Sequence, residues 1–437
     1  MKIAIIGAGA AGCFCAVNLK RMLRDAHVEV FEAGSRPLAK VAVTGGGRCN
    51  LTNTFRDVRS LQQVYPRGHK LMKRLFHQFD HEQLMAWFEA EGVRLTVQED
   101  QCVFPASQDA MQIVNTLLSA MQREGVVLRC GQRVTEIRAT VPDGSPSSHA
   151  AGATTTTAPR YRLTTSSRSA LYDAVIVTTG GSPKASGLDF LQPLGLEIEA
   201  PVPSLFTFKL NSPITELMGV VVEETVVTLA GTKMKAEGPL LITHWGMSGP
   251  AILKLSSHAA RLLAEQQYRA QLNVNWLAGQ NEEAVRQQLE QLLQDNPQKQ
   301  IGSVHLTTDH KLKTGATSPL TTRLWHYLLN ASGIAPERRC AEVGHKQLNR
   351  LASTLTCDTY RLAGQSRFKE EFVTCGGVAL SNIDPNTLEC HQHPGLYLAG
   401  EVLDVDAVTG GFNLQAAWTM GHCIAMALTD SGNRQQQ

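Results

Sequence analysis

The feature that most constrains the fold is a glycine pattern near the N-terminus, GAGAAG at residues 7–12. A short apolar run, Lys2 to Ile6, precedes it, and a helical pattern follows from about Ala10 to Arg24. In such a pattern the first glycine permits a tight turn, the second lets backbone approach a pyrophosphate, and the third allows close helix–strand packing. The alternating stretch HVEVFEA, from His27 to Ala33, predicts a second parallel strand. Together these segments predict a βαβ unit of about 30 residues.

An acidic residue stands where this unit would meet a nucleotide. Glu32 ends the second predicted strand, 20 residues beyond Gly12. A carboxylate at that place can bond a ribose hydroxyl. The strand, helix and acid, in this order, predict a dinucleotide site at the carboxyl end of a parallel sheet. The spacing alone permits either NAD or FAD.

Composition narrows the class of protein. The 437 residues allow two or three domains, and a net charge of +2 creates no strong field for nucleic acid or membrane. No run reaches the ~18 apolar residues of a membrane span, and glycines interrupt the apolar N-terminus, so we expect a cytoplasmic protein without a signal peptide. The ten cysteines contain no C-x-x-C pair. We predict no metal site, since the H-x-H of His391 and His393 precedes a proline in a predicted surface turn.

The order of patterns predicts an α/β domain with an insertion. Residues 68–91 are helical in period, and Val126 to Ala139 predicts two short strands. A Ser/Thr/Ala/Gly-rich stretch, Pro142 to Pro159, predicts a solvated hairpin tip. Beyond it, a β-rich texture is interrupted by a helical pattern near Asn281 to Gln294. We therefore predict four segments: a dinucleotide-binding domain in two parts, 1–192 and 371–437, an inserted β-rich module, 193–315, and a helical module with a return strand, 316–370.

Two further glycine clusters are expected at the same edge of the sheet. The first lies in KVAVTGGGRCNLTN, Lys40 to Asn53, and the second is Gly180-Gly181 after the apolar strand AVIVTT. Three consecutive glycines indicate backbone that bends sharply or lies against another group. With Arg48 and Asn50, the first cluster would offer backbone donors and polar side chains beside a planar ring system. A purely structural glycine loop is the alternative.

A third cluster lies near the C-terminus. Gly400-Glu401 is followed by Asp404 and Asp406 and then by TGGFNLQ, Thr409 to Gln415. An acid after a strand can bond a ribityl hydroxyl, directly or through water. Glycines that open a helix direct free N–H groups and a positive dipole end toward an anion, such as a reduced flavin. A capped helix that follows a turn is the alternative.

With these clusters in order, the sequence resembles the BaiN/YhiN-like family of bacterial NAD(P)/FAD-dependent oxidoreductases. Four blocks carry the resemblance: the N-terminal GAGAAG; Lys40 with GGGRCNLTN; THWGMSGPAIL from Thr243 to Leu253; and the tail GGVALSNIDPNTLEC…PGLYLAGEVLDVDAVTGGFNLQAAWTMG. The pairing of GGGRCN-x-TN with GEVLDVD-x-x-TGGFN-x-Q is the specific part. The blocks extend over nearly the whole chain.

The resemblance implies an α/β fold: a Rossmann-like FAD-binding domain in two parts, like that of glutathione reductase, with an inserted β-rich, barrel-like module and a small helical module. It also implies that GGGRCN lies along the flavin and its ribityl chain, and that Val134 is a backbone neighbour of the adenine. The implied cofactor contacts are Gly7, Gly9, Ala10, Ala11, Gly12, Glu32, Ala33, Lys40, Gly46, Gly47, Arg48, Cys49, Asn50, Thr52, Val134, Thr179, Gly180, Gly400, Glu401, Asp406, Gly410, Gly411, Phe412, Asn413 and Leu414.

The activity implied first is reduction of an activated C=C bond by hydride transfer from flavin N5. NAD(P)H is the expected donor. Because the chain carries one dinucleotide fingerprint only, NAD(P)H would bind transiently over the flavin; reduction by another donor is the alternative. Three alternatives stay open: a flavin amine oxidase that produces hydrogen peroxide, a reductase of uracil in ribosomal RNA, and a flavin-holding protein without turnover. The substrate is thus a small molecule or an RNA base, and the oligomeric state is open.

The RNA alternative requires a basic groove near the flavin. Its binding would depend steeply on salt, because phosphate contacts release counterions. A solvated helix face is the alternative for the cluster at residues 67–74. The candidate residues for a groove are Arg67, Lys70, Lys73, Arg74, Arg338, Arg339, Lys346 and Arg350.

A reductase also needs a general acid, and His244 is the candidate. It lies between an apolar strand and a Gly-rich turn of the predicted insertion, and Trp245 could stack on a flat substrate. The alternative is a hydrogen-bonded structural histidine beside a tryptophan. Cys49 follows Arg48, yet a packed thiol beside the cofactor is favoured over a reactive one, and the same holds for Cys375.

Overall fold

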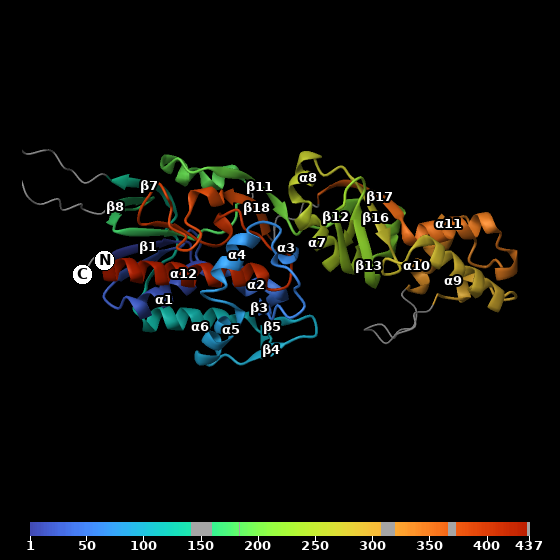
Figure 1. Ribbon diagram of the computed structural model, residues 1–437, viewed down its shortest axis with the longest axis horizontal. Helices are drawn as coiled ribbons and strands as arrows, with labels where there is room; N and C mark the ends of the chain where they lie inside the picture. Colours follow the sequence, from blue (N-terminus) through green and yellow to red (C-terminus); the bar gives the residue numbers. More distant parts are fainter. Residues whose placement is uncertain (141–159, 183, 307–319, 366–372, 435–437) are drawn as a thin grey trace, which may run out of the picture. The chain divides into compact units, whose positions relative to one another are not determined.

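A computed structural model describes residues 1–140, 160–182, 184–306, 320–365 and 373–434 (Figure 1). The chain folds into two compact units. The first comprises Met1–Val202 with Val373–Gln437, and the second comprises Pro203–Phe372. The predicted hairpin tip at 142–159 lies outside the described residues, and the division into four segments stays a prediction.

A five-stranded parallel sheet forms the centre of the first unit. Apart from the half-buried edge strand Val127–Arg129, its strands are mostly buried apolar runs, as expected for a parallel sheet covered on both faces. Ile5 on the central strand pairs with Val30 on one side and Ile176 on the other. The order is β19 (Leu396–Leu398), β10 (Ala174–Val177), β1 (Lys2–Ile6), β2 (His27–Phe31) and β6 (Val127–Arg129).

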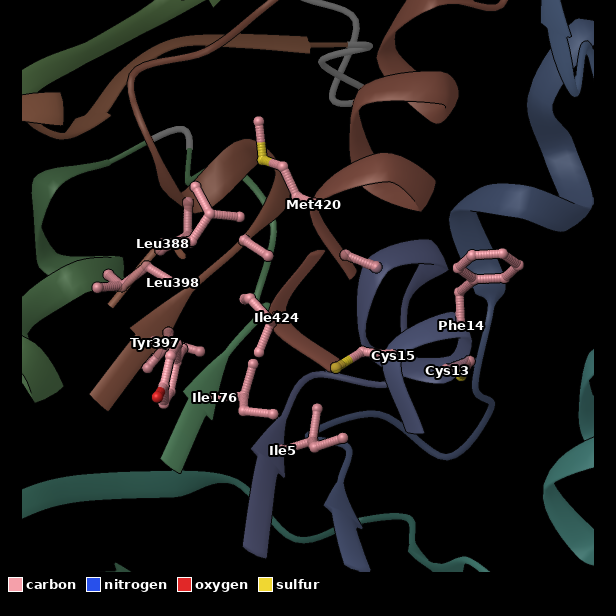
Figure 2. Packing of buried hydrophobic residues seen from close by; sticks show 14 of the residues in the cluster. Ile5, Cys13, Phe14, Cys15, Ile176, Leu388, Tyr397, Leu398, Met420 and Ile424 are labelled. Atoms are coloured by element: carbon pink, nitrogen blue, oxygen red, sulfur yellow. The ribbon is translucent and has the colours of Figure 1, made fainter. Parts of the chain in front are cut away.

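Two helices from opposite ends of the sequence pack together against this sheet. They are α1 (Ala10–Met22) and α12 (Phe412–Arg434). Gly421 permits their close approach, since a Cβ there would lie 2.7 Å from the carbonyl oxygen of Ala11. Figure 2 shows Ile5 and Ile176 of the sheet pointing toward Ile424 of α12 and Cys15 of α1. Helix α6 (Ala110–Arg123) also packs on α1.

The single helix expected over residues 68–91 is two helices, α4 (His69–Leu75) and α5 (His81–Ala90). The break occurs because Asp80 caps α5. Its carboxylate accepts the N–H of Gln83, whose side chain in turn accepts the N–H of Asp80. This reciprocal capping box starts a new helix within an unbroken apolar period.

Smaller elements complete the described part of the first unit. Helices α2 (Ala39–Gly47) and α3 (Leu61–Val64) lie before α4 along the chain. Short 3₁₀ helices are η1 (Ala185–Leu194), η5 (Leu380–Asn382) and η6 (Gly400–Val402). The small sheets are β3 (Thr52–Asn53), β5 (Cys102–Pro105) and β4 (Leu95–Val97); β7 (Val134–Thr140), β8 (Arg160–Thr165) and β9 (Ser169–Tyr172); and β11 (Ile198–Ser204) with β18 (Val373–Val378).

The second unit is a closed six-stranded barrel with helices and a core of its own. Buried Trp276 and Trp325 belong to that core. The helix expected near residues 281–294 is α9 (Glu282–Asp295), capped by Asn281. The barrel order is β12 (Phe208–Leu210), β15 (Gly246–Ser248), β14 (Lys235–Thr243), β13 (Val221–Leu229), β16 (Gln271–Asn275) and β17 (Asp358–Gln365). Further helices are η2 (Pro213–Leu217), α7 (Pro250–His258), α8 (Ala260–Glu265), η3 (Ile301–Ser303), α10 (Thr322–Ala331), η4 (Cys340–Glu342) and α11 (His345–Thr356).

The fold class predicted from the sequence is confirmed. Both ends of the chain build one Rossmann-type α/β unit, and the insertion forms a β-barrel with helices. Within the described ranges, no helix combines the length and the apolar character needed to cross a membrane.

Candidate dinucleotide-binding site

The three glycines of the first motif have different surroundings. Gly7 has φ +107°, and a Cβ on it would lie 2.4 Å from the carbonyl oxygen of Thr178. A Cβ on Gly12 would lie 2.0 Å from the carbonyl oxygen of Gly7. The fold itself therefore requires these two glycines. Gly9 differs, because a Cβ there would meet no protein atom within 4 Å. The backbone at Gly9, which caps α1, is thus open to a ligand.

Glu32 lies at the carboxyl end of β2 and is held by backbone. Its Oε2 accepts the N–H of Ala8 at 3.0 Å, and its Oε1 accepts the N–H of Gly34 at 2.7 Å. An ionised carboxylate has about four lone-pair positions, so a ribose hydroxyl can still be bound. The first contact also ties the acid to the glycine motif, so the two parts of the fingerprint are fixed to each other.

A cavity of about 220 Å³ lies at this edge of the sheet. It brings together the ends of β1, β2 and β10 and the start of β7. The predicted residues among its lining are Gly7, Glu32, Ala33, Val134, Thr179 and Gly180. Other lining residues were not predicted from the sequence, among them Gln132, Arg133, Leu188 and Phe190. The first two lie just before the predicted Val134, whereas Leu188 and Phe190 lie on η1, for which the sequence carries no cofactor signal.

The second glycine cluster forms an exposed bend after a helical turn. Gly45, Gly46 and Gly47 have φ values of +59°, +69° and +83°, the left-handed region that glycine adopts without strain. A Cβ on Gly46 or Gly47 would meet no atom within 4 Å, so their backbone faces open space. Arg48 folds back, with its Nε donating to the Gly45 carbonyl at 3.0 Å and its guanidinium 4.6 Å from the Phe104 ring centroid.

Cys49 is a packed thiol rather than an exposed nucleophile. It is fully buried, with φ +61°. Burial raises the pKa of Cys49 to about 12, against a smaller lowering by a hydrogen bond to Thr44. The thiolate, which is the nucleophilic form, is therefore scarce at neutral pH. Cys375 is also fully buried.

The second cluster is joined to the start of α12 through asparagine side chains. In the amide orientation that gives both atoms a partner, the Asn50 oxygen accepts the N–H of Gly411 at 3.2 Å and its nitrogen donates to the Thr52 carbonyl at 3.0 Å. Asn53 Nδ2 donates to the Gly410 carbonyl at 3.2 Å. In this amide orientation Asn50 engages the Gly411 N–H. Contact of Gly410 and Gly411 with a flavin stays a prediction.

Two more predicted residues hold the segment before α12. Asn413 bonds the backbone of Ala407 twice, accepting its N–H at 2.9 Å and donating to its carbonyl at 2.8 Å. Phe412 receives a hydrogen bond on its carbonyl from Tyr65 at 2.8 Å. These contacts fix the loop that carries Asp406, Gly410 and Gly411 before the helix begins.

Glu401 links α2 to the return segment of the first unit. Its Oε2 lies 3.2 Å from Lys40 Nζ, and its Oε1 accepts the N–H of Thr374 at 2.7 Å. Gly181 must be small here, since a Cβ would lie 2.8 Å from the Glu401 carboxyl carbon. Lys40 is 63% exposed. The predicted residues Lys40, Gly180 and Glu401 are thus neighbours.

Asp406 is engaged by Arg67. The Arg67 guanidinium bonds both carboxylate oxygens, and the Asp406 side chain is buried. Arg67, a candidate for a basic groove, thus pairs with Asp406, and a role in binding RNA stays a prediction. A cofactor contact of Asp406 stays a prediction.

The basic candidates are divided between the units. Lys70, Lys73 and Arg74 are on α4 of the first unit. Lys70 and Lys73 are exposed, and Arg74 donates to the Asn386 side chain at 3.2 Å. Arg338, Arg339, Lys346 and Arg350 belong to the second unit.

His244 belongs to the second unit, whereas the three glycine clusters belong to the first. It occupies the turn between β14 and β15, and its side chain is exposed. Its ring centroid lies 4.0 Å from that of Trp245, with the planes at 81°. The Trp245 carbonyl accepts the N–H of Leu210 at 2.9 Å, which fixes the turn to the neighbouring strand.

The described residues fit an extended dinucleotide. Glu32 and the cavity offer a place for a ribose and a base, the N-terminus of α1 at Gly9 is open to a pyrophosphate, and Gly46 and Gly47 present open backbone beyond it. In the part of the chain that the structure describes, no three His, Cys, Asp or Glu side chains are grouped as metal ligands. His393 Nε2 lies 2.7 Å from the carbonyl oxygen of Leu194, the last residue of η1.

Curated relatives match over almost their whole length. A protein of Clostridium scindens named 3-dehydro-bile acid delta(4,6)-reductase is 26% identical over 98% of this chain and 99% of its own. Proteins named ribosomal RNA dihydrouridine synthase are 26% identical in Haemophilus influenzae, over 97% of this chain and 98% of theirs, and 27% identical in Escherichia coli, over 97% of both.

Solved structures match this chain at low sequence identity. An E. coli quinol fumarate reductase FrdA variant has a TM-score of 0.48 at 14% identity, covering 100% of this chain and 71% of that one. The 3-ketosteroid delta1-dehydrogenase of Sterolibacterium denitrificans has a TM-score of 0.48 at 11% identity, covering 98% and 99%.

The resemblance drawn from the glycine blocks is confirmed at the level of family. The sequence matches the family described as HI0933-like protein Rossmann domain over residues 1–427. That match includes the first glycine motif, the inserted barrel and most of α12. The chain therefore belongs to the HI0933-like family of Rossmann-domain proteins.

Proposed function

We propose that the protein is an FAD-dependent oxidoreductase that reduces an activated C=C bond. The observation that carries this proposal is the cavity at the carboxyl edge of the sheet, lined by Gly7, Glu32 and Val134. Membership of the HI0933-like family supports it, as do relatives whose names describe reduction. The protein is an enzyme of the flavin-dependent oxidoreductase class.

The residues would hold FAD along the edge of the sheet. Glu32 would bond the adenosine ribose, with Val134 beside the adenine. The N-terminus of α1, open at Gly9, would receive the pyrophosphate on its free N–H groups and positive dipole end. The bend at Gly46 and Gly47 and the first turn of α12 would hold the flavin end. FAD, when bound, supplies the hydride chemistry that side chains lack.

The chain would supply orientation and a proton. His244 is the proposed general acid, which would donate an imidazole N–H proton to the substrate carbon that does not receive hydride. Its exposure on the β14–β15 turn makes it accessible. Trp245 would offer a flat apolar face for a ring. Because tyrosine and cysteine side chains near the glycine clusters are buried with raised pKa values, as at Tyr65 and Cys49, they are weaker candidates at neutral pH.

The substrate class follows from the relatives. The names of the C. scindens protein and of the two dihydrouridine synthases describe the addition of hydrogen to unsaturated rings. We therefore propose an unsaturated ring compound as substrate, with NAD(P)H as a transient donor. A uracil base of ribosomal RNA is the second candidate, favoured by exposed Lys70 and Lys73 on α4.

The first experiment mixes the purified yellow protein with NADH or NADPH without oxygen and follows flavin absorbance near ~450 nm. Bleaching followed by slow reoxidation in air is expected of a reductase. Failure to bleach, with fast reoxidation and hydrogen peroxide after chemical reduction, would instead indicate an amine oxidase. A protein that binds no FAD when it is supplied would contradict the proposal altogether.

His244 is tested separately from the flavin. His244→Gln should leave bleaching by NAD(P)H unchanged and slow substrate reduction by about 10²-fold or more, the usual range for loss of a general acid. His345→Gln, which changes another exposed histidine of the same unit, is the matched control. Equal rates in the two variants would remove His244 from the mechanism.

A further inference from the structure

A chain of buried polar side chains crosses the core of the first unit. The Thr52 hydroxyl donates to Gln415 Oε1 at 2.5 Å, and Gln415 Nε2 donates to the Thr419 hydroxyl oxygen at 3.0 Å. The Thr419 hydroxyl then donates to the Phe79 carbonyl at 3.0 Å. Thr52, Gln415 and Thr419 are each 0% exposed. The chain thus runs from β3 through α12 to the turn before α5.

Burying these groups is costly unless each one is bonded. Each donor in this chain faces an acceptor: the Thr52 hydroxyl faces the Gln415 oxygen, the Gln415 nitrogen faces the Thr419 oxygen, and the Thr419 hydroxyl faces the Phe79 carbonyl. Both ends of the Gln415 amide are used, the oxygen by Thr52 and the nitrogen by Thr419. A leucine at position 415 would fill the space without any such requirement. The glutamine therefore fixes a relative position of β3 and α12 that apolar packing alone would leave free to slide.

This position matters because β3 and α12 carry the two flavin-end segments of the proposed site. Thr52 follows the glycine bend by a few residues, and Gln415 lies one turn inside α12, with its N–H on the Gly411 carbonyl at 3.0 Å. Thr52 and Gln415 are 363 residues apart in the sequence. They belong to the same junction as Asn50 and Asn53.

The backbones of β3 and α12 approach each other closely at the junction. A Cβ on Gly411 would lie 2.3 Å from the Thr52 carbonyl oxygen, so the two backbones are already in contact. Trp418, one turn further along α12, donates its indole N–H to the Leu51 carbonyl at 3.1 Å. Successive residues of the segment are thus bonded to successive turns of the helix. Loss of the central bond can only widen or shift this contact.

We propose that Gln415, acting through Thr52, is a positioning residue that sets FAD affinity and flavin reduction potential. It does so by holding the segment after the GGGRCN bend in register with the first turn of α12. This inference rests on the proposed function. Neither side chain contacts the cofactor in this scheme, since both are buried behind the backbone that would.

The central test is Thr52→Val, which removes the hydroxyl and keeps the shape. Loss of one buried hydrogen bond corresponds to about tenfold in an equilibrium constant. We expect the FAD dissociation constant, measured by titration, to rise about tenfold. If α12 loses alignment toward the reduced, anionic flavin, the reduced form is bound less tightly relative to the oxidised form. The midpoint potential of the two-electron couple then falls by about 30 mV for each tenfold loss in that relative affinity. Thr52→Ser, which retains the hydroxyl, should restore both values.

Thr225→Val is the matched control. Thr225 is 1% exposed, and its hydroxyl donates to the Gly238 carbonyl at 2.8 Å within the barrel unit. It should lower unfolding stability without changing FAD affinity or potential. If Thr52→Val and Thr225→Val have the same FAD affinity and potential as the wild type, the inference is overturned while the proposed function stands. A wild-type protein that binds no FAD overturns both.

A double variant tests whether the two side chains act together. Gln415→Met keeps an unbranched side chain of similar length and removes both amide bonds. Each single change should weaken FAD binding about tenfold, and the double change by about tenfold rather than a hundredfold, because one shared bond is lost. Additive effects would contradict action through Thr52. Should Thr52→Val fail to fold, Gln415→Met alone makes the same prediction against the Thr225→Val control.

Discussion

The two ends of the proposed FAD site are built by different means. At the adenosine end, Gly7, Gly12 and Glu32 belong to one βαβ unit of about 30 residues. Gly12 packs on the Gly7 carbonyl and Glu32 accepts the N–H of Ala8 within this unit, while Gly7 also packs on Thr178 just after the neighbouring strand β10. At the flavin end, the GGGRCN segment meets α12 through the side chains of Asn50 and Asn53. The first end thus depends mainly on contacts within the βαβ unit. The second exists only when both halves of the unit have folded together.

We expect the largest loss of unfolding stability from a substitution at the adenosine end. Gly12→Ala should lower unfolding stability by about 3 kcal/mol or more, because a Cβ 2.0 Å from the Gly7 carbonyl oxygen forces backbone to move. Gly9→Ala should leave the stability of FAD-free protein within about 0.5 kcal/mol and weaken FAD binding. Urea unfolding with and without FAD measures both. Equal destabilisation of the FAD-free forms would show that Gly9 is a packing residue.

We expect a somewhat smaller loss of stability at the flavin end, where Gly47 provides a closely matched control for Gly411. Gly411 and Gly47 have φ values of +87° and +83°, yet a Cβ on Gly411 would lie 2.3 Å from the Thr52 carbonyl oxygen, whereas one on Gly47 would meet no atom within 4 Å. Gly47→Ala should cost about 1–2 kcal/mol, the left-handed strain of an L-residue. Gly411→Ala should cost about 1–3 kcal/mol more, from overpacking. Chemical denaturation measures the loss of unfolding free energy in each variant. Identical losses would mean that the backbone at the junction moves to accommodate the extra methyl group at little cost.

Low pH should lower the free energy of unfolding through His422, a residue of α12. His422 on α12 stacks on Phe79 at 4.1 Å between centroids, and burial lowers the pKa of His422 to about 4. The unfolded chain, with a pKa near ~6.5, then binds the proton first as pH falls. Stability that is present above pH ~6.5 is therefore lost toward pH 4, by about 2–3 kcal/mol.

The measurement is the free energy of unfolding against pH for wild type and His422→Leu. We expect a flatter profile between pH ~4 and ~6.5 for the variant, since the group that titrates is gone. Glu29 supplies an internal reference. Burial opposes its ionisation, but hydrogen bonds from Arg129, His27 and Tyr172 outweigh burial and lower the pKa of Glu29 to about 2. Its contribution, present above about pH 4.5 and lost toward pH 2, should stay in both proteins.

The smallest effect is expected at the ion pair of Lys40 and Glu401. Lys40 is 63% exposed, so Lys40→Met should change stability by less than about 1 kcal/mol. The difference should shrink further as salt rises, because exposed pairs are screened. Thermal unfolding at low and high salt measures it. A loss as large as that of Gly411→Ala would place this link, rather than the asparagine junction, at the centre of the flavin end.

Much of the fold could be predicted from short patterns, and one visible pattern was overlooked. The βαβ unit, α9 and the strands around residue 130 were predicted correctly. The break between α4 and α5 was not, although Asp80 and Gln83 stand at the spacing of a capping box. An apolar period that continues through the break outweighed that signal. The pairing of Asp406 with Arg67 left no such trace, because the two residues lie 339 positions apart in the sequence.

The sequence by itself determined the glycine turns, the helix caps and the position of Glu32, because each depends on backbone preferences within a few residues. Only the tertiary structure decided what those turns meet. Asn50 faces Gly411, Thr52 bonds Gln415, and the six short strands of the insertion close into a barrel. Such contacts join residues hundreds of positions apart, and their partners are selected by how sheet and helices assemble, which local preferences do not encode.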